Sequence, residues 1–313
     1  MTNISLWNNL DTQKRKYHNG GQKKNDRESE AYVMDIRFEK REHLKEKPDQ
    51  KHLGFGKYMT DYMFVMDWTK EEGWKDARIV PEGPITMDPA CVTLHYAQET
   101  FEGMKAYRTA EGKIQLFRPE MNAKRMINSN ARLCMPELPV DMFVEAVKAL
   151  VKVEEDWVPS EPETSLYIRP FMFATEAALG VHMASAYKFM IICCPVGAYY
   201  AEGINPVKIL VEDELVRAVK GGTGFTKCGG NYAGSILGQV KAEKMGYSQV
   251  LWLDGEHRKY VEEVGTMNIM FKIAGEIYTA PIEGTVLPGV TRDSMIHLLR
   301  DWGYKVNETR LSV

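Results

Sequence analysis

The sequence has few cysteines, no long apolar run and no large excess of either charge sign. Its 313 residues include five cysteines, an odd number without C-x-x-C spacing, which argues against a disulfide-based fold and is typical of a reducing compartment. No apolar stretch reaches the ~18 residues of a membrane span, and the first residues do not have a signal-peptide pattern. The net charge of −3 favours neither a nucleic-acid nor a membrane partner. We therefore expect a cytoplasmic protein that acts on small molecules.

Residues 1–30 differ in composition from the rest of the chain. They are polar and charged, with no apolar period after Leu10, and we expect them to form a disordered extension. Their acidic residues disfavour a transit peptide. The pattern leaves two translation starts open, Met1 and Met34.

The remaining sequence predicts an α+β protein of two domains. Hydrophobic residues make up 44% of the chain, and the length suffices for two cores. We place the domains at 31–194 and 206–313, joined by a linker at 195–205. In the first domain, runs rich in aromatic and β-branched residues predict strands at 62–68, 78–89, 91–108, 113–119, 165–175 and 187–195. Apolar residues at helical spacing predict helices at roughly 119–132 and 141–157.

The second domain is expected to alternate strands, helices and a glycine-rich loop. Its predicted elements are a strand at 207–213, a short helix after it, the loop at 221–232, a helix near 231–245, a strand at 249–255, a hairpin at 261–273 and a helix capped by Thr291.

The loop GGTGFTKCGGNY, at 221–232, surrounds one lysine with glycines. A phosphate-binding P-loop needs glycine before the lysine and Ser or Thr after it, whereas Thr226 and Cys228 flank Lys227. A dinucleotide-binding loop needs a third glycine at the position of Lys227. Both phosphate-loop interpretations fail. The residues alone leave two alternatives, an exposed lysine in an ordinary loop or a nucleophilic lysine in a tight cavity.

Eight segments, in order over about residues 50–313, together resemble the branched-chain amino-acid aminotransferases, which are pyridoxal-phosphate enzymes of fold type IV. The segments are LHYAQETFEGMKAYR, LFRPEMNAKRM, SLYIRP, CCPVGAYY, GGTGFTKCGGNYAGS, VLWLDG, EEVGTMNIMF and LPGVTRDS. The resemblance implies a smaller N-terminal α/β sandwich domain, a larger C-terminal pseudo-barrel domain, a homodimer and the cofactor pyridoxal 5'-phosphate (PLP).

Lys227 matches the family's lysine that condenses with the cofactor's aldehyde. That chemistry needs a neutral amine, which a tight pocket favours. Glu263 matches the carboxylate that keeps the pyridine nitrogen protonated. Its neighbour Glu262 is the alternative, but strand alternation sends the two side chains to opposite faces.

The other cofactor residues bind the cofactor's oxygen atoms. Tyr232 matches the tyrosine that hydrogen-bonds the phenolic O3′. Arg125 matches the phosphate-binding arginine, since a guanidinium suits a phosphate dianion. Val290 and Thr291 begin a predicted helix, whose free N–H groups and dipole suit the same phosphate.

The substrate residues are assigned from the resemblance. Phe55, Tyr96, Phe101 and Tyr167 match an aromatic pocket, which packing in an ordinary core would also explain. Burial of each substrate methylene contributes ~0.8 kcal/mol, so such a pocket should reject alanine and separate leucine, isoleucine and valine poorly.

Four further residues complete this substrate set. Leu179 and Val181 match a loop that reaches into the neighbouring subunit's site in family dimers. Arg169 matches a partner for the side-chain carboxylate of glutamate or 2-oxoglutarate, and Thr266 should offer its backbone N–H to the α-carboxylate.

The resemblance implies a ping-pong aminotransferase that moves the amino group of a branched-chain amino acid to 2-oxoglutarate and releases a 2-oxo acid and glutamate. Two alternatives remain: a D-amino-acid aminotransferase or aminodeoxychorismate lyase of the same fold, and a chain without catalysis. Family members continue for about fifty further residues, including a Gly-Ser-Gly-Thr-Ala-like loop, so we expect an incomplete C-terminal domain.

Overall fold

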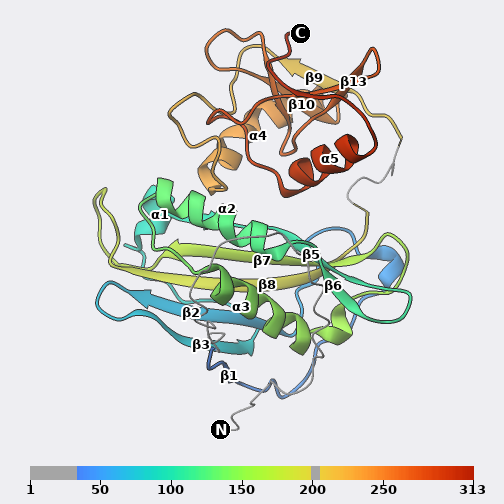
Figure 1. Ribbon diagram of the computed structural model, residues 1–313. Coiled ribbons are helices and arrows are strands. Elements are labelled where there is room, and N and C mark those ends of the chain that lie inside the picture. The colour runs from blue at the N-terminus through green and yellow to red at the C-terminus, as the bar shows by residue number, and fades with distance from the viewer. Residues whose placement is uncertain (1–33, 199–204) are drawn as a thin grey trace, which may run out of the picture.

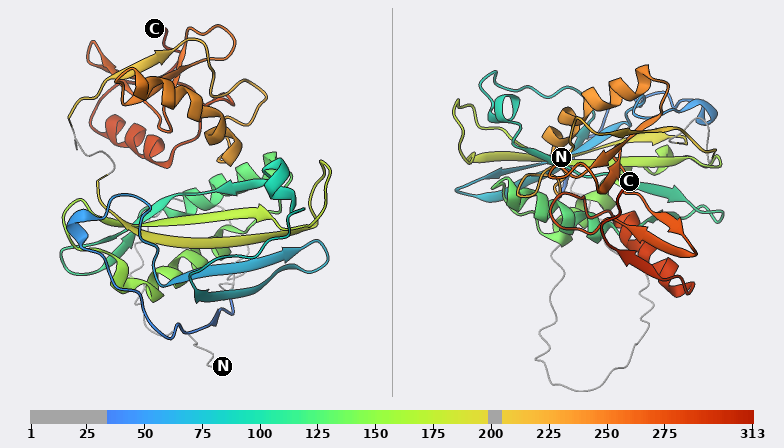
Figure 2. Two further views of the ribbon diagram at one scale, coloured as in Figure 1. Left: turned by 180° about the vertical axis from the view of Figure 1, so that it is seen from behind. Right: turned by 90° about the horizontal axis from the view of Figure 1, so that it is seen from above.

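The computed structural model describes residues 34–198, here called the N-terminal part, and 205–313, the C-terminal part. One eight-stranded sheet lies in the N-terminal part and two three-stranded sheets lie in the C-terminal part. Figure 1 shows helix α2 between the large sheet and the C-terminal part, and Figure 2 shows the same stacking from behind. The predicted extension 1–30 lies outside the described residues, as do 199–204 of the predicted linker.

The large sheet has the order β1-β3-β2-β8-β7-β5-β6, with β4 paired to β7. Only β1 and β3 run parallel, and the other pairs are antiparallel. The strands are β1 (Arg37–Phe38), β2 (Tyr62–Thr69), β3 (Gly73–Pro81), β4 (Glu99–Phe101), β5 (Met104–Arg108), β6 (Ile114–Leu116), β7 (Ser165–Ala174) and β8 (Ala186–Val196). The helices are α1 (Val92–Tyr96), α2 (Pro119–Arg132) and α3 (Val140–Val153), with short 3-10 turns at Gln50–His52 and Glu155–Trp157.

The main core lies between one face of this sheet and helices α2 and α3. Helix α3 buries its predicted apolar stripe, including Phe143, Val147 and Leu150. Alternate residues of strand β7, such as Leu166 and Ile168, belong to the same core and cover this stripe from the side of the sheet. The two predicted helices of the N-terminal part are therefore confirmed.

The predicted strand at 91–108 is wrong over its first third. Residues 92–96 form helix α1, although Val92 and Thr93 are β-branched. The helix buries Val92 and ends at Ala97, which adopts the left-handed φ of 50°. Burial of one side chain and a local turn thus outweigh strand propensity, which depends strongly on context.

The C-terminal part contains strands and two helices around smaller cores. Its sheets have the orders β11-β10-β9 and β12-β13-β14. The elements are β9 (Ile209–Glu212), α4 (Gly229–Lys244), β10 (Gln249–Leu253), β11 (Val261–Val264), β12 (Phe271–Ile273), β13 (Glu276–Thr279), α5 (Val290–Asp301) and β14 (Val306–Glu308). Between Val261 and Ile273 the chain is not a simple hairpin, because β12 pairs with β13 instead of β11.

Two further local predictions in this part are wrong. The short helix after β9 is absent, and residues 213–228 form turns and bends. The Glu212 carboxylate accepts the N–H groups of Glu214 and Leu215 at 2.9 and 3.0 Å, which turns the chain away from the strand. Helix α5 is capped by Gly289 and not by Thr291. The division into two domains stays a prediction.

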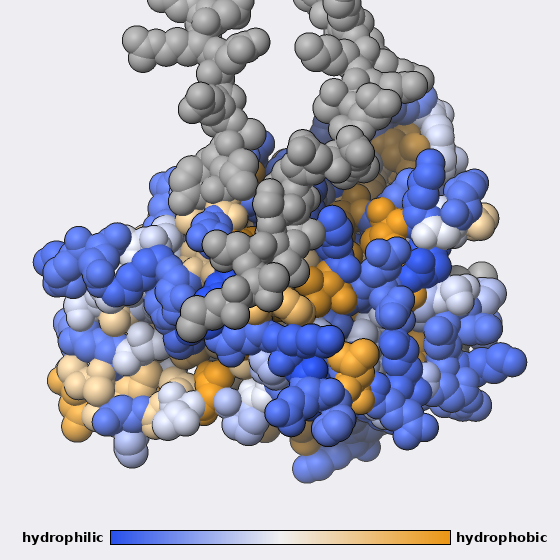
Figure 3. All heavy atoms as spheres, turned by 90° about the horizontal axis from the view of Figure 1, so that it is seen from below, coloured by the Kyte–Doolittle hydropathy of each residue, from blue (hydrophilic) through white to orange (hydrophobic). Residues whose placement is uncertain are grey.

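One face of the protein carries small apolar areas among polar side chains (Figure 3). Outside the grey atoms, the face seen from below is mostly hydrophilic and has separate hydrophobic patches (Figure 3). No helix among the described residues combines the length and apolarity needed to cross a membrane.

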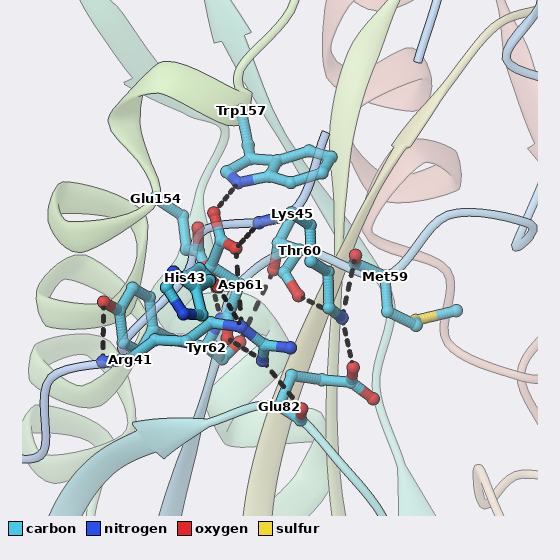
Figure 4. A network of polar contacts seen from close by, with 10 residues as sticks. All are labelled: Arg41, His43, Lys45, Met59, Thr60, Asp61, Tyr62, Glu82, Glu154 and Trp157. Atoms are coloured by element: carbon cyan, nitrogen blue, oxygen red, sulfur yellow. Dashed lines mark hydrogen bonds and ion pairs between the residues drawn. The ribbon is translucent and has the colours of Figure 1, made fainter. Parts of the chain in front are cut away.

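A polar network beneath the main core fixes residues 41–45 against the sheet (Figure 4). The Asp61 carboxylate accepts the Trp157 indole N–H and the Lys45 backbone N–H, both at 2.7 Å. The Lys45 ammonium donates to the Thr60 carbonyl at 2.8 Å and pairs with Glu82. Through these hydrogen bonds, the polar groups that are buried in this region have hydrogen-bond partners inside the protein.

Glu154 is a second buried acid of this network, beside Asp61. Its carboxylate accepts the Tyr62 N–H at 2.5 Å. Burial raises its pKa from the ordinary 4.5 to about 7, although this hydrogen bond favours the charged form.

We predict that Glu154 makes the protein less stable as pH rises. Between the ordinary pKa of 4.5 and the folded value of about 7, the folded state binds more protons than the unfolded state. The free energy of unfolding therefore falls through this window, by up to ~3 kcal/mol from this group. Urea unfolding should show a smaller loss for Glu154→Gln than for the wild type. Equal losses in both proteins would contradict the prediction.

Candidate active site

A cavity of about 630 Å³ opens between the N-terminal and C-terminal parts. Residues from both parts line it, including those of β5, α2, the loop before α4 and the start of α5. Its polar lining includes Lys105, Asn122, Arg125, Tyr167, Lys227, Thr266, Asn268 and Thr291. The size suits a small organic ligand.

Lys227 is held at this cavity by the N-terminal part. Its backbone N–H donates to the Ser129 hydroxyl of α2 at 2.9 Å, and its carbonyl accepts the Phe101 N–H at 2.9 Å. Its side-chain amine donates to the Tyr232 hydroxyl at 2.7 Å and lies 4.5 Å from the centre of the Phe101 ring. The lysine is therefore fixed at both its backbone and its amine, which excludes the exposed-loop alternative.

Burial lowers the pKa of Lys227 to about 8. The carboxylates of Glu102 and Glu263 oppose this shift, while the cations Arg125 and Arg169 add to it. With a pKa of about 8, roughly a tenth of the amine is neutral at pH 7, far more than for an ordinary lysine, and this fraction is available as a nucleophile.

The glycines of the loop serve packing as well as access. A side chain at Gly224 would meet the Thr285 carbonyl at 2.6 Å, and Gly221 has the left-handed φ of 81°. Gly229 leaves room for the Glu99 carboxylate, which accepts its N–H. Glycine is needed here because the loop lies tightly against both parts of the protein.

Glu263 lies in a dense polar cluster and does not itself line the cavity, but it contacts two residues that do, Asn268 and Leu287. Its carboxylate pairs with Arg217 at 2.7 Å and accepts the Asn268 amide at 2.8 Å and the Leu287 N–H at 3.3 Å. Burial raises the pKa of Glu263 to about 7, and the Arg217 charge acts against that shift. Glu262 points instead toward a separate cavity that also contains Lys220 and Arg310. The two glutamates thus lie on opposite faces, as strand alternation predicts.

The Arg125 guanidinium reaches the cavity from α2. It forms two parallel bonds to Glu102, Nε to Oε1 at 2.8 Å and Nη2 to Oε2 at 2.7 Å, and Nη1 donates to the Pro288 carbonyl at 3.2 Å. Burial disfavours its charged form, but the Glu102 carboxylate more than compensates and the pKa of Arg125 is raised. Arg125 therefore stays a cation at the cavity wall.

The first residues of α5 lie at the same wall. Gly289, Val290 and Thr291 all line the cavity, and no side chain caps the helix. The first N–H groups of a helix have no partner within the helix. Arg125 and this helix start together form an anion site suited to a phosphate group.

Aromatic residues surround the lysine. The Phe101 and Tyr232 rings lie 4.8 Å apart, and the Phe55 and Tyr167 rings lie 4.9 Å apart. Arg169 donates to the Tyr167 hydroxyl at 2.7 Å and lies over the Phe101 ring at 4.6 Å. The predicted residues Phe101, Tyr167 and Arg169 are thus brought together, and Phe55 joins them from the loop 53–57.

Three predicted substrate residues lie away from this cavity in the same chain. Leu179 and Val181 are exposed at 68% and 87%. The Tyr96 hydroxyl accepts the Gly180 N–H at 2.9 Å, so Tyr96 supports the loop that carries them. None of the three lines the cavity.

The other predicted residues Phe55, Phe101 and Arg169 do not line the cavity either. They contact two residues that do, Tyr167 and Lys227.

The residues present fit the cofactor that the sequence implies. PLP has an aldehyde, a pyridine nitrogen and a phosphate, which need an amine, an acid and an anion site respectively. Lys227, Glu263 and the Arg125–α5 site supply these groups. Tyr232 stays a neutral phenol because its pKa is raised, chiefly by burial, so that it can donate a hydrogen bond.

Several residues that support this site are not among those predicted from the sequence. Arg217 and Asn268 hold Glu263, Ser129 holds the Lys227 backbone, and Glu102 holds Arg125. Glu102 lies in the segment LHYAQETFEGMKAYR and Asn268 in the segment EEVGTMNIMF. Their place in these segments of the resemblance was the only sign in the sequence that they could belong to the site. Ser129 carries no signal of its own, because its role depends on contact between distant segments.

Comparison with known proteins identifies relatives over most of the chain. The family model for class IV aminotransferases matches residues 99–313. Branched-chain-amino-acid aminotransferase 2 of Bacillus subtilis is 52% identical over 278 residues, which cover 89% of this chain and 77% of that protein. Branched-chain-amino-acid transaminase 1 of the same organism is 54% identical over 279 residues, which cover 89% of this chain and 78% of that protein.

Solved structures of branched-chain aminotransferases are also similar to this chain. The branched-chain aminotransferase of Escherichia coli superposes with a TM-score of 0.68 at 27% identity, over 80% of this chain and 78% of that chain. The branched-chain aminotransferase of Thermobaculum terrenum, in its PLP-containing holo form, has a TM-score of 0.67 at 25% identity, over 81% and 78%. The chain therefore belongs to the class IV aminotransferases of fold type IV and, within them, to the branched-chain-amino-acid aminotransferases, a family of PLP-dependent enzymes.

Proposed function

We propose that this chain transfers the amino group of leucine, isoleucine or valine to 2-oxoglutarate in a reversible ping-pong reaction. The observation that carries the proposal is the buried amine of Lys227, held by Tyr232 in a cavity that also contains an anion site at Arg125. The close relatives named as branched-chain aminotransferases favour this activity over a D-amino-acid aminotransferase or a lyase of the same fold.

When bound, PLP supplies an aldehyde that condenses with amines and a ring that accepts the electron pair left by Cα–H cleavage. Lys227 would provide the amine for this aldehyde, and the same amine would hold or move the proton at the substrate Cα. Glu263 would pair with the protonated ring nitrogen, and the charge of Arg217 favours the ionised form of the Glu263 carboxyl. Arg125 and the N–H groups of Val290 and Thr291 hold the phosphate.

The substrate side chain lies against the aromatic residues in our proposal. Phe101 and Tyr167 exclude water from an aliphatic chain, and Arg169 binds the second carboxylate of glutamate or 2-oxoglutarate. The Thr266 backbone N–H binds the α-carboxylate.

We further propose a cytoplasmic homodimer. Leu179 and Val181 are strongly exposed on a loop that Tyr96 supports, and a second copy would bury them at its own site. This arrangement accounts for the position of all three residues outside the cavity of their own chain.

Lys227 should be the residue that borohydride links to PLP. Burial lowers the pKa of both lysines that line the cavity, Lys105 and Lys227, and it lowers that of Lys227 to about 8. Reduction of the PLP-loaded protein followed by peptide mapping should place the tag on residue 227. A tag on another lysine would refute the assignment. Lys227→Ala should lose transamination by more than ~10³-fold while keeping the fold, as circular dichroism would check.

The substrate preference follows from the apolar pocket. Leucine, isoleucine and valine should each support turnover with 2-oxoglutarate, with kcat/KM values within roughly 200-fold of one another. Alanine should be much poorer, because it lacks two or three methylene-sized groups worth ~0.8 kcal/mol each. Steady-state assays with the four amino acids measure this. Equal kcat/KM for alanine and leucine would contradict the proposal.

Arg217 should affect chemistry more than cofactor attachment. Arg217→Met removes the cation that opposes the raised pKa of Glu263, so Glu263 becomes protonated and a protonated ring nitrogen would lose its anionic partner. We expect kcat to fall at least ~10-fold, while borohydride still links PLP to Lys227. An unchanged kcat in a folded, PLP-loaded variant would exclude this role.

A further inference from the structure

We propose that Glu102 is a positioning residue that fixes the Arg125 guanidinium as a preorganised receptor for the cofactor's phosphate. The proposal rests on the phosphate-binding role of Arg125 in the proposed function. It concerns a carboxylate at the end of β4 that would itself touch neither the cofactor nor the substrate.

The contact between the two side chains has the geometry of a tight bidentate pair. Both Glu102 oxygens accept from Arg125, at 2.8 and 2.7 Å, and Glu102 has no exposed surface while Arg125 is 9% exposed. Two parallel bonds fix the plane of a guanidinium as well as its position. The orientation of the remaining Arg125 N–H groups is therefore determined by Glu102.

Glu102 is itself held firmly. The Asn122 amide donates to its Oε2 at 2.9 Å, and its backbone N–H donates to the Pro170 carbonyl at 2.7 Å. Asn122 and Arg125 lie one turn apart on α2, so the helix presents both donors to the same carboxylate. The carboxylate is a fixed point that joins β4, β7 and α2.

The bond pattern of Arg125 leaves donors for a ligand. A guanidinium carries five N–H groups. Among the described residues, two of the five are used by Glu102 and one by the Pro288 carbonyl, next to the start of α5. The two others remain for an anion in the cavity that Arg125 lines.

The negative charge of Glu102 allows an experiment to distinguish a positioning role from a purely electrostatic effect. Glu102 carries the same charge sign as a phosphate, so simple electrostatics predicts that its neutralisation would strengthen phosphate binding. A positioning role predicts the opposite, because a released arginine side chain must lose its rotamer freedom when the ligand binds. The bidentate geometry and complete burial of Glu102 favour the positioning effect.

The test uses the cofactor-free full chain and compares two ligands. The dissociation constants of PLP and of pyridoxal, which has the same aldehyde and ring without the phosphate, are measured by absorbance. In Glu102→Gln we expect PLP binding to weaken ~10- to 100-fold and pyridoxal binding to change less than ~3-fold. Glu102→Asp keeps the charge but shortens the side chain, and it should also lose PLP affinity selectively.

Two further variants distinguish the positioning of Arg125 from a general loss of stability. Glu154→Gln removes another buried carboxylate of the N-terminal part, in the separate network of Figure 4, and should leave the affinities of both ligands unchanged. In the Arg125→Met background, Glu102→Gln should weaken PLP binding by less than ~3-fold, because the group that it positions is gone. If Glu102→Gln does not fold, the Glu102→Asp measurement decides.

Three results would overturn the proposal. They are unchanged or tighter PLP binding in both Glu102 variants, equal loss of PLP and pyridoxal, and a full effect of Glu102→Gln in the Arg125→Met background. The measurements use no amino-acid substrate. A wild-type protein that prefers PLP to pyridoxal but does not turn over leucine would refute the proposed function and leave this inference intact.

Discussion

The structure depends on the way the N-terminal part holds the backbone of Lys227. The Ser129 hydroxyl and the Phe101 N–H bind the two polar groups of this one residue, each at 2.9 Å. Both partners belong to the N-terminal part, which carries the large sheet. The Lys227 side chain is therefore held between the N-terminal and C-terminal parts, where burial lowers the pKa of its amine to about 8. The reactivity of the lysine is thus a consequence of packing between segments about a hundred residues apart in the sequence.

The charges around the cavity follow from this burial. Arg125, Arg169 and Lys227 are cations that would repel one another in a dry site, and Glu102 and Glu263 offset them. Each carboxylate is held by several donors, which keeps its position fixed before a ligand arrives. Fixed charges of this kind bind a phosphate and stabilise charge during reaction without rearrangement of the protein.

Local patterns predicted most of the secondary structure, and the chemistry predicted much of the site. Helices α2 and α3 follow from the helical spacing of apolar residues, and strands β7 and β8 follow from their aromatic and β-branched residues. Helix α1 could not be predicted in this way, because the burial of Val92 and the turn at Ala97 outweigh the strand propensity of its residues. Lys227 and Glu263 stand in recognisable segments. Ser129 and Arg217 could not be found in this way, since their roles arise only when distant segments meet. Tyr96 could be identified, but its position beside the loop at 179–181 could not.

The central claim is that burial gives Lys227 an amine that is partly neutral near neutral pH. The most direct test is a pH titration of the ε-carbons of ¹³C-labelled lysine in the cofactor-free protein by NMR, with the Lys227 signal assigned by its loss in Lys227→Arg. The account predicts a midpoint near 8. A midpoint at the ordinary value of 10.5, in a protein shown to be folded, would contradict it.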